Sequence, residues 1–251
     1  MKRMLDLHMH VVPGIDDGAR SIEEAIEMLR ISAQQGVTDI FCTSHNGYSL
    51  EDGERYTEQL AILRDEAKSA GINIQLHRGC EILCAGEYID DIIYGLNIGA
   101  FSTLGDTKYV LTEFYSNARP SEALYIIESL KNSGYNPIIA HMERNYNITG
   151  FMVNTLIQSG ALIQVNAHSF VDERDIEIKC RARELLKNRY VHFIGSDSHR
   201  IDHRPPDITS GITYITNNAD AEYARRILYG NANSLLIKQS NPGVRFMGHS
   251  V

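Results

Sequence analysis

The first residues of the chain that could do chemistry are two histidines and a pair of aspartates. His8 and His10 are separated by one residue, and Asp16-Asp17-Gly18 follows them. Side chains on a strand alternate with a period of two, so both imidazoles should point to the same face. They could then bind one metal ion together, although an isolated His-x-His more often lies on a solvated strand face. The rest of the chain decides between these two interpretations.

Histidines and carboxylates recur where later strands are expected to end. They are His45, Glu81, Glu113, His141, Asp197 and His199, and with His8 and His10 they make up the candidate metal ligands at the strand ends. Taken one at a time, each has an ordinary explanation: His45 or Asp197 could cap a helix, and Glu81 or Glu113 could pair with an arginine. Scattered polar residues would not fall at six of seven predicted strand ends, so we interpret the set as a metal site.

The donor atoms of this set indicate the kind of metal and the kind of reaction. Imidazole nitrogen and carboxylate oxygen, with no thiolate, suit Zn, Fe or Mn rather than a soft metal or a cluster. Eight or nine candidate ligands are too many for one ion and imply two or three. Closely spaced ions bridged by a carboxylate and a hydroxide hydrolyse phosphate esters, because they lower the pKa of the bridging water and neutralise the attacking and leaving oxygens.

A phosphate ester also needs cationic donors, and two arginines are placed to provide them. Arg144 lies three residues after His141, and Arg204 lies five residues after His199. The planar guanidinium group suits bidentate contacts to phosphate oxygens. Taken alone, each arginine could equally be a surface residue.

Other hydrolytic chemistries lack their residues. A cysteine-dependent phosphatase loop needs an arginine six residues after the nucleophile, but these positions after the four cysteines hold Tyr48, Gly86, Asp90 and Leu186. The chain also contains no G-x-S-x-G elbow, P-loop or dinucleotide-binding glycine motif. Metal-assisted hydrolysis is therefore the chemistry that the sequence favours.

The elements that must position these residues alternate between strand and helix. After the first strand, which carries His8 and His10, strands are predicted over 37–43, 72–80, 109–112, 137–140, 161–165 and 191–195. Helices are predicted from a capping box at Ser21 to Gly36 and over 56–70, 88–94, 120–132, 151–159, 172–188 and 219–229. This alternation predicts an α/β fold, a distorted seven-stranded (β/α)7 TIM-like barrel. In such barrels the active site lies at the carboxyl ends of the strands, where the candidate ligands fall.

Composition and charge limit the partners and the domain count. The 251 residues are 43% apolar and 22% charged, and we predict one domain, 1–251, with an irregular tail after about residue 241. The net charge of −8 argues against nucleic acid or an anionic membrane as a partner. The chain has no signal peptide, no membrane-length apolar run and no C-x-x-C pair among its four cysteines. We therefore expect a cytoplasmic protein with free thiols.

Several short motifs together resemble a known superfamily. They are Asp6-Leu7-His8-Met9-His10, Asp16-Asp17-Gly18, Thr43-Ser44-His45, Gly79-Cys80-Glu81-Ile82, Glu113-Phe114, Ala140-His141-Met142-Glu143-Arg144 and Ser196-Asp197-Ser198-His199. The chain resembles the PHP (polymerase and histidinol phosphatase) superfamily, and more narrowly the bacterial manganese-dependent protein-tyrosine phosphatases of capsular and exopolysaccharide loci. The resemblance runs from the first strand to about residue 237, nearly the whole chain.

The resemblance implies a role for each matched residue. One ion would be held by His8, His10, Glu81 and Asp197, a second by Glu81, Glu113 and His141, and a third by Asp17, His45 and His199. It also implies a PHP-type barrel with two or three divalent ions at its mouth, Mn first, with Fe, Zn or Mg as alternatives. Arg144 and Arg204 match the family's phosphate-contacting arginines.

The function expected on this basis is hydrolysis of protein phosphotyrosine. A metal-bridging hydroxide would attack phosphorus while Arg144 and Arg204 hold the phosphate oxygens. The partner would be a bacterial tyrosine kinase that controls capsular or exopolysaccharide synthesis. The sequence identifies no proton donor, with His168 a weak candidate. The oligomeric state is not predicted.

Three other functions are left open by the sequence. The nearest is a small-molecule phosphatase of the histidinol-phosphate type, which would need a lidded pocket where a peptide substrate needs an open one. The irregular run from Cys84 to Gly105 is the segment that could form such a lid. A nuclease is disfavoured by the acidic charge balance. A metal-bound interaction protein without catalytic activity is disfavoured because every ligand position is filled.

Overall fold

Strands and helices alternate along the chain in the computed structural model, which describes residues 3–45 and 49–240. The strands are β1 (Leu5–Met9), β2 (Asp39–Cys42), β3 (Gln75–Arg78), β4 (Glu81–Cys84), β5 (Tyr109–Phe114), β6 (Asn136–Ile139), β7 (Leu162–Asn166) and β8 (Phe193–Gly195). The helices are α1 (Ile22–Gln34), α2 (Leu50–Ser69), α3 (Ile89–Ile98), α4 (Pro120–Asn132), α5 (Gly150–Gln158), α6 (Ile176–Lys187), α7 (Thr209–Asn218), α8 (Ala221–Arg225) and α9 (Asn231–Ser240). Short helical turns are η1 (Gly86–Tyr88), η2 (Met142–Arg144), η3 (His168–Phe170) and the π-helical η4 (Arg226–Gly230).

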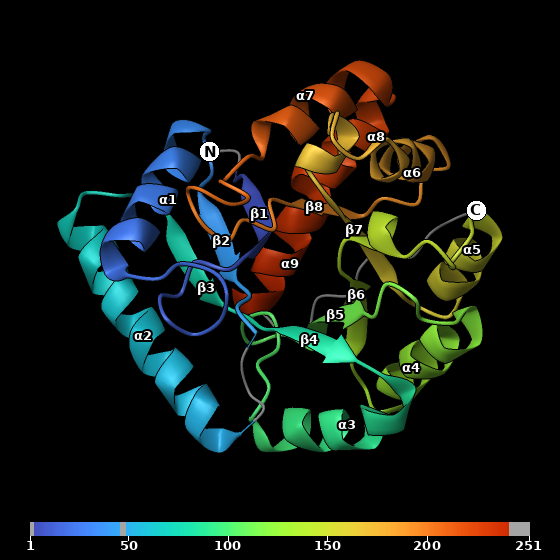
Figure 1. Cartoon of the computed structure of the whole chain (residues 1–251), viewed down its shortest axis with the longest axis horizontal. Coiled ribbons are helices and arrows are strands. Elements are labelled where there is room, and N and C mark those ends of the chain that lie inside the picture. Colours follow the sequence, from blue (N-terminus) through green and yellow to red (C-terminus); the bar gives the residue numbers. More distant parts are fainter. Residues whose placement is uncertain (1–2, 46–48, 241–251) are drawn as a thin grey trace.

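The strands form two parallel sheets that meet at β1 and β8. The sheets have the orders β1-β2-β3 and β4-β5-β6-β7-β8. Past the end of β8, the Asp197 backbone N–H donates to the carbonyl oxygen of His8 at 2.7 Å, and the His10 N–H donates to that of Ser198 at 2.9 Å. Helices α1 to α6 lie around the strands (Figure 1). The predicted α/β class with parallel strands is confirmed.

The predicted count of seven strands is wrong for the described part of the chain, which has eight. The strand predicted over 72–80 ends at Arg78, and a new strand starts at Glu81 and pairs with β5 instead of β2. At the break, a Cβ atom on Gly79 would lie 3.1 Å from side chains of Leu104 and Thr43, so a larger residue there would require these side chains to shift by a few tenths of an ångström. The break moves the chain from one sheet to the other just before Glu81.

The interior between the two sheets is apolar at the amino ends of the strands. Buried side chains from both sheets meet the last helix in one cluster, which includes Leu5, Leu7, Phe41, Leu111, Ile138, Phe193, Ala232, Leu235 and Leu236. Figure 1 shows α9 in the middle of the ring of helices. A second, larger cluster packs the outer faces of the strands against the surrounding helices. The fold therefore has an inner core closed by α9 and an outer core under the other helices.

The carboxyl-terminal helices differ from the prediction. A helix was predicted over 219–229, but the chain forms α7, α8, the π-helical turn η4 and then α9, which runs to Ser240. The apolar residues Leu235 and Leu236 have no partners in the local sequence, because they pack on strands from the start of the chain. The tail predicted to be irregular after about residue 241 lies outside the described residues.

The first helix shows why the other helical predictions largely succeeded. The Ser21 hydroxyl accepts a hydrogen bond from the Glu24 N–H at 3.3 Å, as the capping box predicts, and Gly36 follows the helix with φ of 84°. Helix α2 starts at Leu50 rather than 56, because Ser49 caps it. The helix predicted over 88–94, within the less regular run after Cys84, is present as the longer α3, and η1 precedes it. No helix in the described ranges has both the length and the apolar content to cross a membrane.

Candidate metal centre

Strand β1 contains a shift of register just before its two histidines. Asp6 pairs with Ile40 of β2, but Met9 pairs with Cys42, so β1 uses three steps where β2 uses two. This is the geometry of a β-bulge, in which one extra residue changes the face to which the following side chains point.

The bulge turns the histidines inward. Leu5 and Leu7 already point into the inner core, so strict alternation would direct His8 and His10 outward. Instead both are fully buried, and their Nε2 atoms lie 3.0 Å apart. The period of two correctly places the imidazoles together, and the bulge decides that they face the site.

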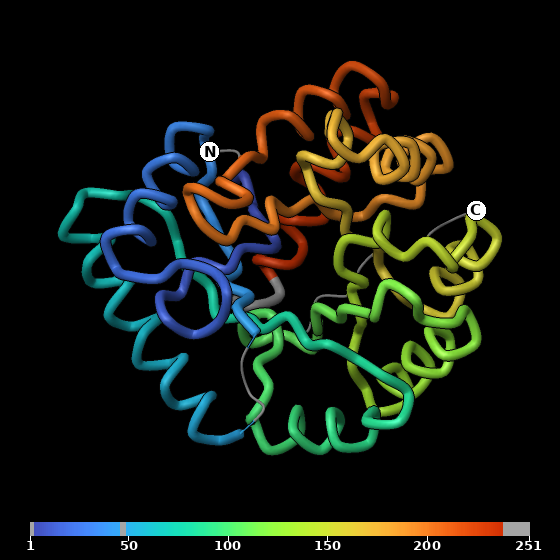
Figure 2. The backbone as a smooth tube through the Cα atoms, in the orientation of Figure 1, coloured from blue at the N-terminus to red at the C-terminus, as the bar shows by residue number. Residues whose placement is uncertain are grey.

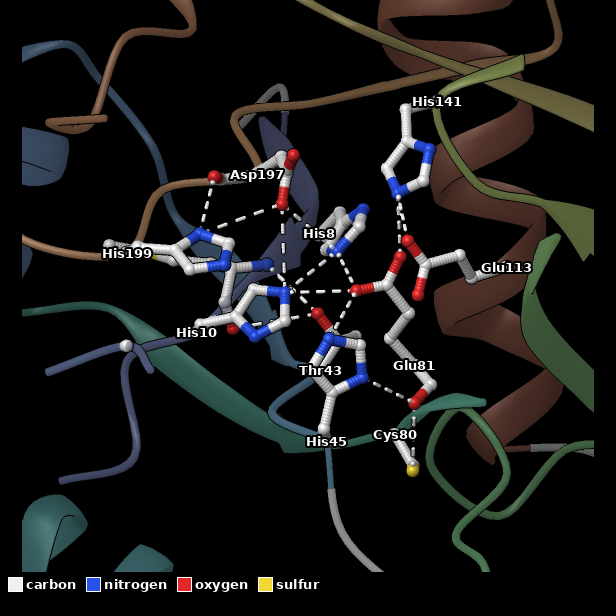
Figure 3. A network of polar contacts seen from close by, with 12 residues as sticks. His8, His10, Thr43, His45, Cys80, Glu81, Glu113, His141, Asp197 and His199 are labelled. Atoms are coloured by element: carbon white, nitrogen blue, oxygen red, sulfur yellow. Dashed lines mark hydrogen bonds and ion pairs between the residues drawn. The ribbon is translucent and has the colours of Figure 1, made fainter. Parts of the chain in front are cut away.

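Four buried side chains converge on one point (Figure 3), three of them at or just past the carboxyl ends of β1 and β8 and the fourth, Glu81, at the start of β4, just past the end of β3. They are His8, His10, Glu81 and Asp197, whose potential ligand atoms all lie within 4.8 Å of one another. Glu81 Oε2 is 3.0 Å from His8 Nε2 and 3.1 Å from His10 Nε2. Asp197 Oδ1 lies 3.4 Å from His8 Nε2. The first ligand set that the resemblance implied is thus brought together.

The other expected ligands surround this group. His141 Nε2 lies 2.8 Å from Glu81 Oε1 and 3.5 Å from Glu113 Oε1, so the members of the second set are adjacent. The third set is more spread. His199 Nε2 is 3.5 Å from Asp17 Oδ1, whereas the compact groups that contain His45 are His10-Asp17-His45 and His45-Glu81-Glu113. His45 therefore lies between the expected second and third sets.

Four of the histidines are oriented through their other ring nitrogen. Nδ1 contacts an oxygen in each of these pairs: His8 with Gln164 Oε1 at 3.3 Å, His10 with Asp16 Oδ2 at 2.7 Å, His45 with the carbonyl of Glu81 at 3.1 Å and His199 with that of Asp197 at 2.9 Å. An Nδ1–H that donates to oxygen leaves Nε2 as the basic atom. Metal-binding histidines are commonly held in this way.

Neighbouring charges and hydrogen bonds outweigh burial in setting the pKa values of Glu81 and His10. Burial opposes ionisation of Glu81, but the imidazoles of His8, His10 and His141 overcome it and hold the pKa of that carboxyl well below its usual range. Burial would lower the pKa of His10, yet hydrogen bonds to Asp16 and Glu81 raise it well above its usual value. Without a metal, protons therefore stay among these groups.

The donor set fits divalent cations. When both Nδ1 atoms donate, His8 and His10 direct two Nε2 lone pairs at each other across 3.0 Å, which is repulsive unless a proton or a cation lies between them. The surrounding donors are carboxylate oxygens and imidazoles, with no thiolate, as Zn, Fe or Mn prefers. Ion binding would release the proton that the raised pKa of His10 retains.

Asp197 joins the cluster to both arginines. Its Oδ2 atom lies 2.9 Å from Arg144 Nη1 and 2.8 Å from Arg204 Nη1. Burial would raise the pKa of Asp197, but the positive charges of His8, Arg144 and other neighbours lower it. Each arginine side chain is about one-third exposed, at 33% and 32%. The two guanidinium groups thus lie at the open side of the cluster.

Two further ligands have altered acidity. Burial and the negative charge of Glu81 raise the pKa of Glu113. Burial and the neighbouring charge of His10 lower the pKa of His199 to about 4. The ring of His199 stacks on that of His10 with centroids 4.0 Å apart. His199 is therefore neutral at pH 7, the state in which an imidazole can bind a metal.

Backbone strain is concentrated at this site. In the described ranges, four residues other than glycine have positive φ, and three of them are His141 (29°), Asp197 (52°) and Arg204 (53°). Such conformations are costly and persist where the surroundings enforce them, commonly at functional sites. The strained residues are two candidate ligands and one candidate phosphate-binding arginine.

Sequence analysis missed the polar residues behind the ligands. Asp16 accepts from the His45 N–H at 2.8 Å as well as contacting His10, and Asn166 donates to Asp197 Oδ2 at 2.9 Å. Gln164 in turn donates to Asn166 Oδ1 at 2.8 Å. A signal was available, because Gln164 and Asn166 are polar residues two apart in an otherwise apolar strand.

Two other predictions concern residues outside the cluster. His168 Nδ1 lies 3.0 Å from Asp207 Oδ2, and its contacts in the described chain include none with the candidate ligands. Cys42, Cys80 and Cys84 are buried free thiols as predicted, whereas Cys180 is exposed.

The fold and the site define a class, an α/β protein with a buried histidine–carboxylate cluster and two arginines at the carboxyl ends of parallel strands. Residues 4–237 match the family described as capsular polysaccharide synthesis, CpsB/CapC. The chain belongs to this family, which confirms the resemblance read from its motifs.

Comparisons with individual proteins agree. The chain is 34% identical over 206 residues to the CapC protein of Staphylococcus aureus, covering 80% of this chain and 79% of that protein. It is 30% identical over 245 residues to tyrosine-protein phosphatase CpsB of Streptococcus pneumoniae, covering 94% and 99%. Among solved structures it matches one from the work on YwqE of Bacillus subtilis and CpsB of S. pneumoniae, described as unique metal-dependent tyrosine phosphatases. That match has a TM-score of 0.83, 26% identity and 95% coverage of both chains.

Proposed function

We propose that this chain is a metal-dependent protein-tyrosine phosphatase. The observation that carries the proposal is the buried His8-His10-Glu81-Asp197 group with Arg144 and Arg204 on the outer oxygen of Asp197. The names of full-length relatives support the same reaction.

The proposed ligands are the nine residues expected from the sequence. His8, His10, Glu81 and Asp197 would hold one ion, Glu81, Glu113 and His141 a second, and Asp17, His45 and His199 a third. Manganese is the proposed metal, in two or three sites. When bound, the ions would activate water and neutralise charge on the phosphate oxygens.

Arg144 and Arg204 are proposed to bind the phosphate group. Both now share a single carboxylate oxygen, and a phosphate would give each guanidinium an oxygen of its own. Arg204 has a positive φ of 53°, and its guanidinium donates to Asp197 Oδ2 at 2.8 Å. The two arginines would hold the phosphate oxygens while attack occurs from the metal side.

Phosphotyrosine suits a site without an assigned proton donor. A phenol has a pKa of about 10, so its anion leaves with less help from a general acid than an alkoxide needs. The open position of the arginines also favours a side chain carried on a protein over a small metabolite enclosed by a lid.

The substrate is proposed to be a tyrosine-phosphorylated kinase that acts in capsular or exopolysaccharide synthesis. We further propose a cytoplasmic protein with one domain, whose two sheets act as one distorted barrel. The inner core, which takes side chains from both sheets, supports this description. The observations give no specific support to a histidinol-phosphate substrate or to an inactive binding protein.

The deciding experiment compares two substrates on chelator-stripped protein resupplied with Mn. We expect kcat/KM to be at least about tenfold higher for a tyrosine-phosphorylated peptide than for histidinol phosphate, with activity lost on stripping. Asp197→Ala should abolish turnover, whereas the exposed control Asp65→Ala should not. Preference for histidinol phosphate, or full turnover without metal, would overturn the proposal.

A further inference from the structure

Exposed aromatic side chains are concentrated in one part of this protein. Six aromatic residues are markedly exposed in the described ranges, and all lie between residues 88 and 151. They are Tyr88 (55%), Tyr94 (66%), Tyr115 (51%), Tyr125 (51%), Tyr146 (39%) and Phe151 (79%). Large exposed aromatic side chains are costly in water, and their clustering commonly marks a surface that binds a partner.

Four of these residues lie on the face that carries the candidate metal centre. Tyr88, Tyr115, Tyr146 and Phe151 occupy the loops or first helical turns that follow β4, β5 and β6, three neighbouring strands. These segments leave the carboxyl ends of their strands, and the helices that follow, α3, α4 and α5, are consecutive in the ring (Figure 1). We call these four residues the aromatic rim.

Two residues of the aromatic rim follow residues of the proposed site closely in the sequence. Tyr115 is two residues after Glu113, and Tyr146 is two residues after Arg144. The two loops are joined, because Asn147 Nδ2 donates to the carbonyl oxygen of Asn117 at 3.1 Å. The Tyr146 ring also lies 5.7 Å from the guanidinium carbon of Arg181, which helps to hold it in place.

A hollow in the surface lies beside the aromatic rim. A cavity of about 410 Å³ between η1 and the start of α4 is lined by Gly86, Glu87, Arg119, Ser121, Glu122 and Tyr125. Two of the lining residues are joined by a hydrogen bond, because the Gly86 N–H donates to Glu122 Oε1 at 3.1 Å. Tyr125 lines this hollow and packs beside Gly86. Gly86 lies two residues before Tyr88, so Tyr125 connects the hollow to the rim.

The loops on the opposite side of the site differ in their exposed side chains. The loops after β1 and β8 lie side by side (Figure 2), and they are joined by an ion pair between Arg20 and Asp202. In the described part of these loops no aromatic side chain is markedly exposed. The exposed aromatic side chains of the described residues are therefore distributed asymmetrically around the cluster: they follow β4 to β6, whereas the loops after β1 and β8 expose the ion pair and Ile201.

We propose that the aromatic rim binds the segment of the substrate protein that flanks the phosphotyrosine. This inference rests on the proposed function, since it assumes that Arg144 holds the phosphate. Tyr115 and Tyr146 each lie two residues from a residue of the proposed site, Glu113 or Arg144, so their backbones are within about 7 Å of it. An extended peptide advances about 3.3 Å per residue, so two or three residues beside the phosphotyrosine span that distance. Aromatic rings offer large contact area at little cost in side-chain entropy. The rim thus distinguishes a protein substrate from a small aryl phosphate.

The test compares two substrates on the metal-loaded full-length chain. In the double variant Tyr115→Ala/Tyr146→Ala, we expect kcat/KM for a tyrosine-phosphorylated peptide of about ten residues to fall about tenfold, through KM. Activity on p-nitrophenyl phosphate should change less than about twofold, which also shows that the variant is folded. The matched control is Tyr94→Ala, because Tyr94 is also exposed, at 66%, but lies in the middle of α3.

Each of the other outcomes would contradict the proposal that the aromatic rim binds the substrate protein. Equal losses on both substrates would make the tyrosines part of the catalytic machinery, and no loss on the peptide would show that it binds elsewhere. A change of oligomeric state in the variant would identify the rim as a contact between copies of this chain. If the wild-type protein hydrolyses neither substrate, the phosphatase proposal fails as well, which separates its failure from that of the rim alone.

Discussion

The two ends of the strands carry side chains of opposite polarity: charged and polar at the carboxyl ends, apolar at the amino ends. At the carboxyl ends, His8, Glu81 and Asp197 are buried charged or polar groups, in contact with strained backbone at Asp197 and His141. At the amino ends, the same strands direct apolar side chains into an inner core that α9 closes. A few residues along a strand therefore separate a site that needs a cation from a core that excludes water.

The difference teaches where this fold obtains its stability. Buried ionisable groups are expensive unless each is paired, and a set of carboxylates and imidazoles that waits for a metal is an incomplete pairing. Burial of apolar surface at the amino ends must offset that cost. We therefore expect substitutions at the carboxyl ends to reduce activity and substitutions at the amino ends to reduce stability.

The largest effect is expected from Glu81→Gln at the carboxyl end. It removes the carboxylate that contacts His8, His10 and His141, and we expect kcat/KM on an aryl phosphate to fall at least about 1,000-fold, with loss of bound metal. Steady-state kinetics and elemental analysis of the purified protein measure both. Glu128→Gln, exposed on α4, is the control. Wild-type metal content in Glu81→Gln would show that this carboxylate is not a ligand.

The matching change at the amino end is Leu235→Ala. Leu235 is fully buried in the inner core, so its loss should leave a cavity and lower the free energy of unfolding by about 3 kcal/mol. Urea unfolding measures this, and kcat well below the transition should stay within about twofold of wild type. Ile237→Ala, on the same helix but 52% exposed, should change stability little. Similar losses in both variants would mean that α9 does not close the core.

A smaller effect on the site is expected from Asp16→Asn. Asp16 contacts His10 Nδ1 at 2.7 Å and so orients a candidate ligand without being one. We expect metal affinity to fall about 10- to 100-fold, with activity largely restored by excess Mn. A metal titration followed by activity tests this, with Asp91→Asn, exposed on α3, as the control. Activity that no concentration of metal restores would instead make Asp16 part of the reaction.

The smallest effect concerns a buried charge at the amino end of β2. Burial would raise the pKa of Asp39, but His77, Arg3 and Thr38 together lower it to about 2. Because the folded value lies below the unfolded value of about 3.9, Asp39 stabilises the protein by about 1 to 2 kcal/mol above pH 4, and this is lost as the pH falls from about 4 to 2.

Asp39→Asn tests this contribution. The variant should be less stable than wild type at pH 7, and the difference should narrow steadily as the pH falls toward 3. Urea unfolding at several pH values gives both curves, with the exposed Asp65→Asn as the control. A difference that does not depend on pH would assign the effect to lost packing.

The sequence alone determined the chemistry of this protein. Residue type and order placed histidines and carboxylates after successive strands, set two arginines near them, and carried the family motifs over nearly the whole chain. The alternation of strand and helix was equally visible, because periodicity and caps such as Ser21 act over a few residues. Both are local properties of the chain.

Only the tertiary structure decided how these residues meet. The bulge in β1 that turns His8 inward, the break after which a new strand begins at Glu81 in the other sheet, and the closure of the inner core by α9 each depend on segments far apart in the chain. The residues behind the ligands, such as Asp16 and Asn166, were missed for the same reason. Strand register and core packing arise from non-local contacts. A local sequence pattern does not indicate which distant segment a strand or helix will pack against.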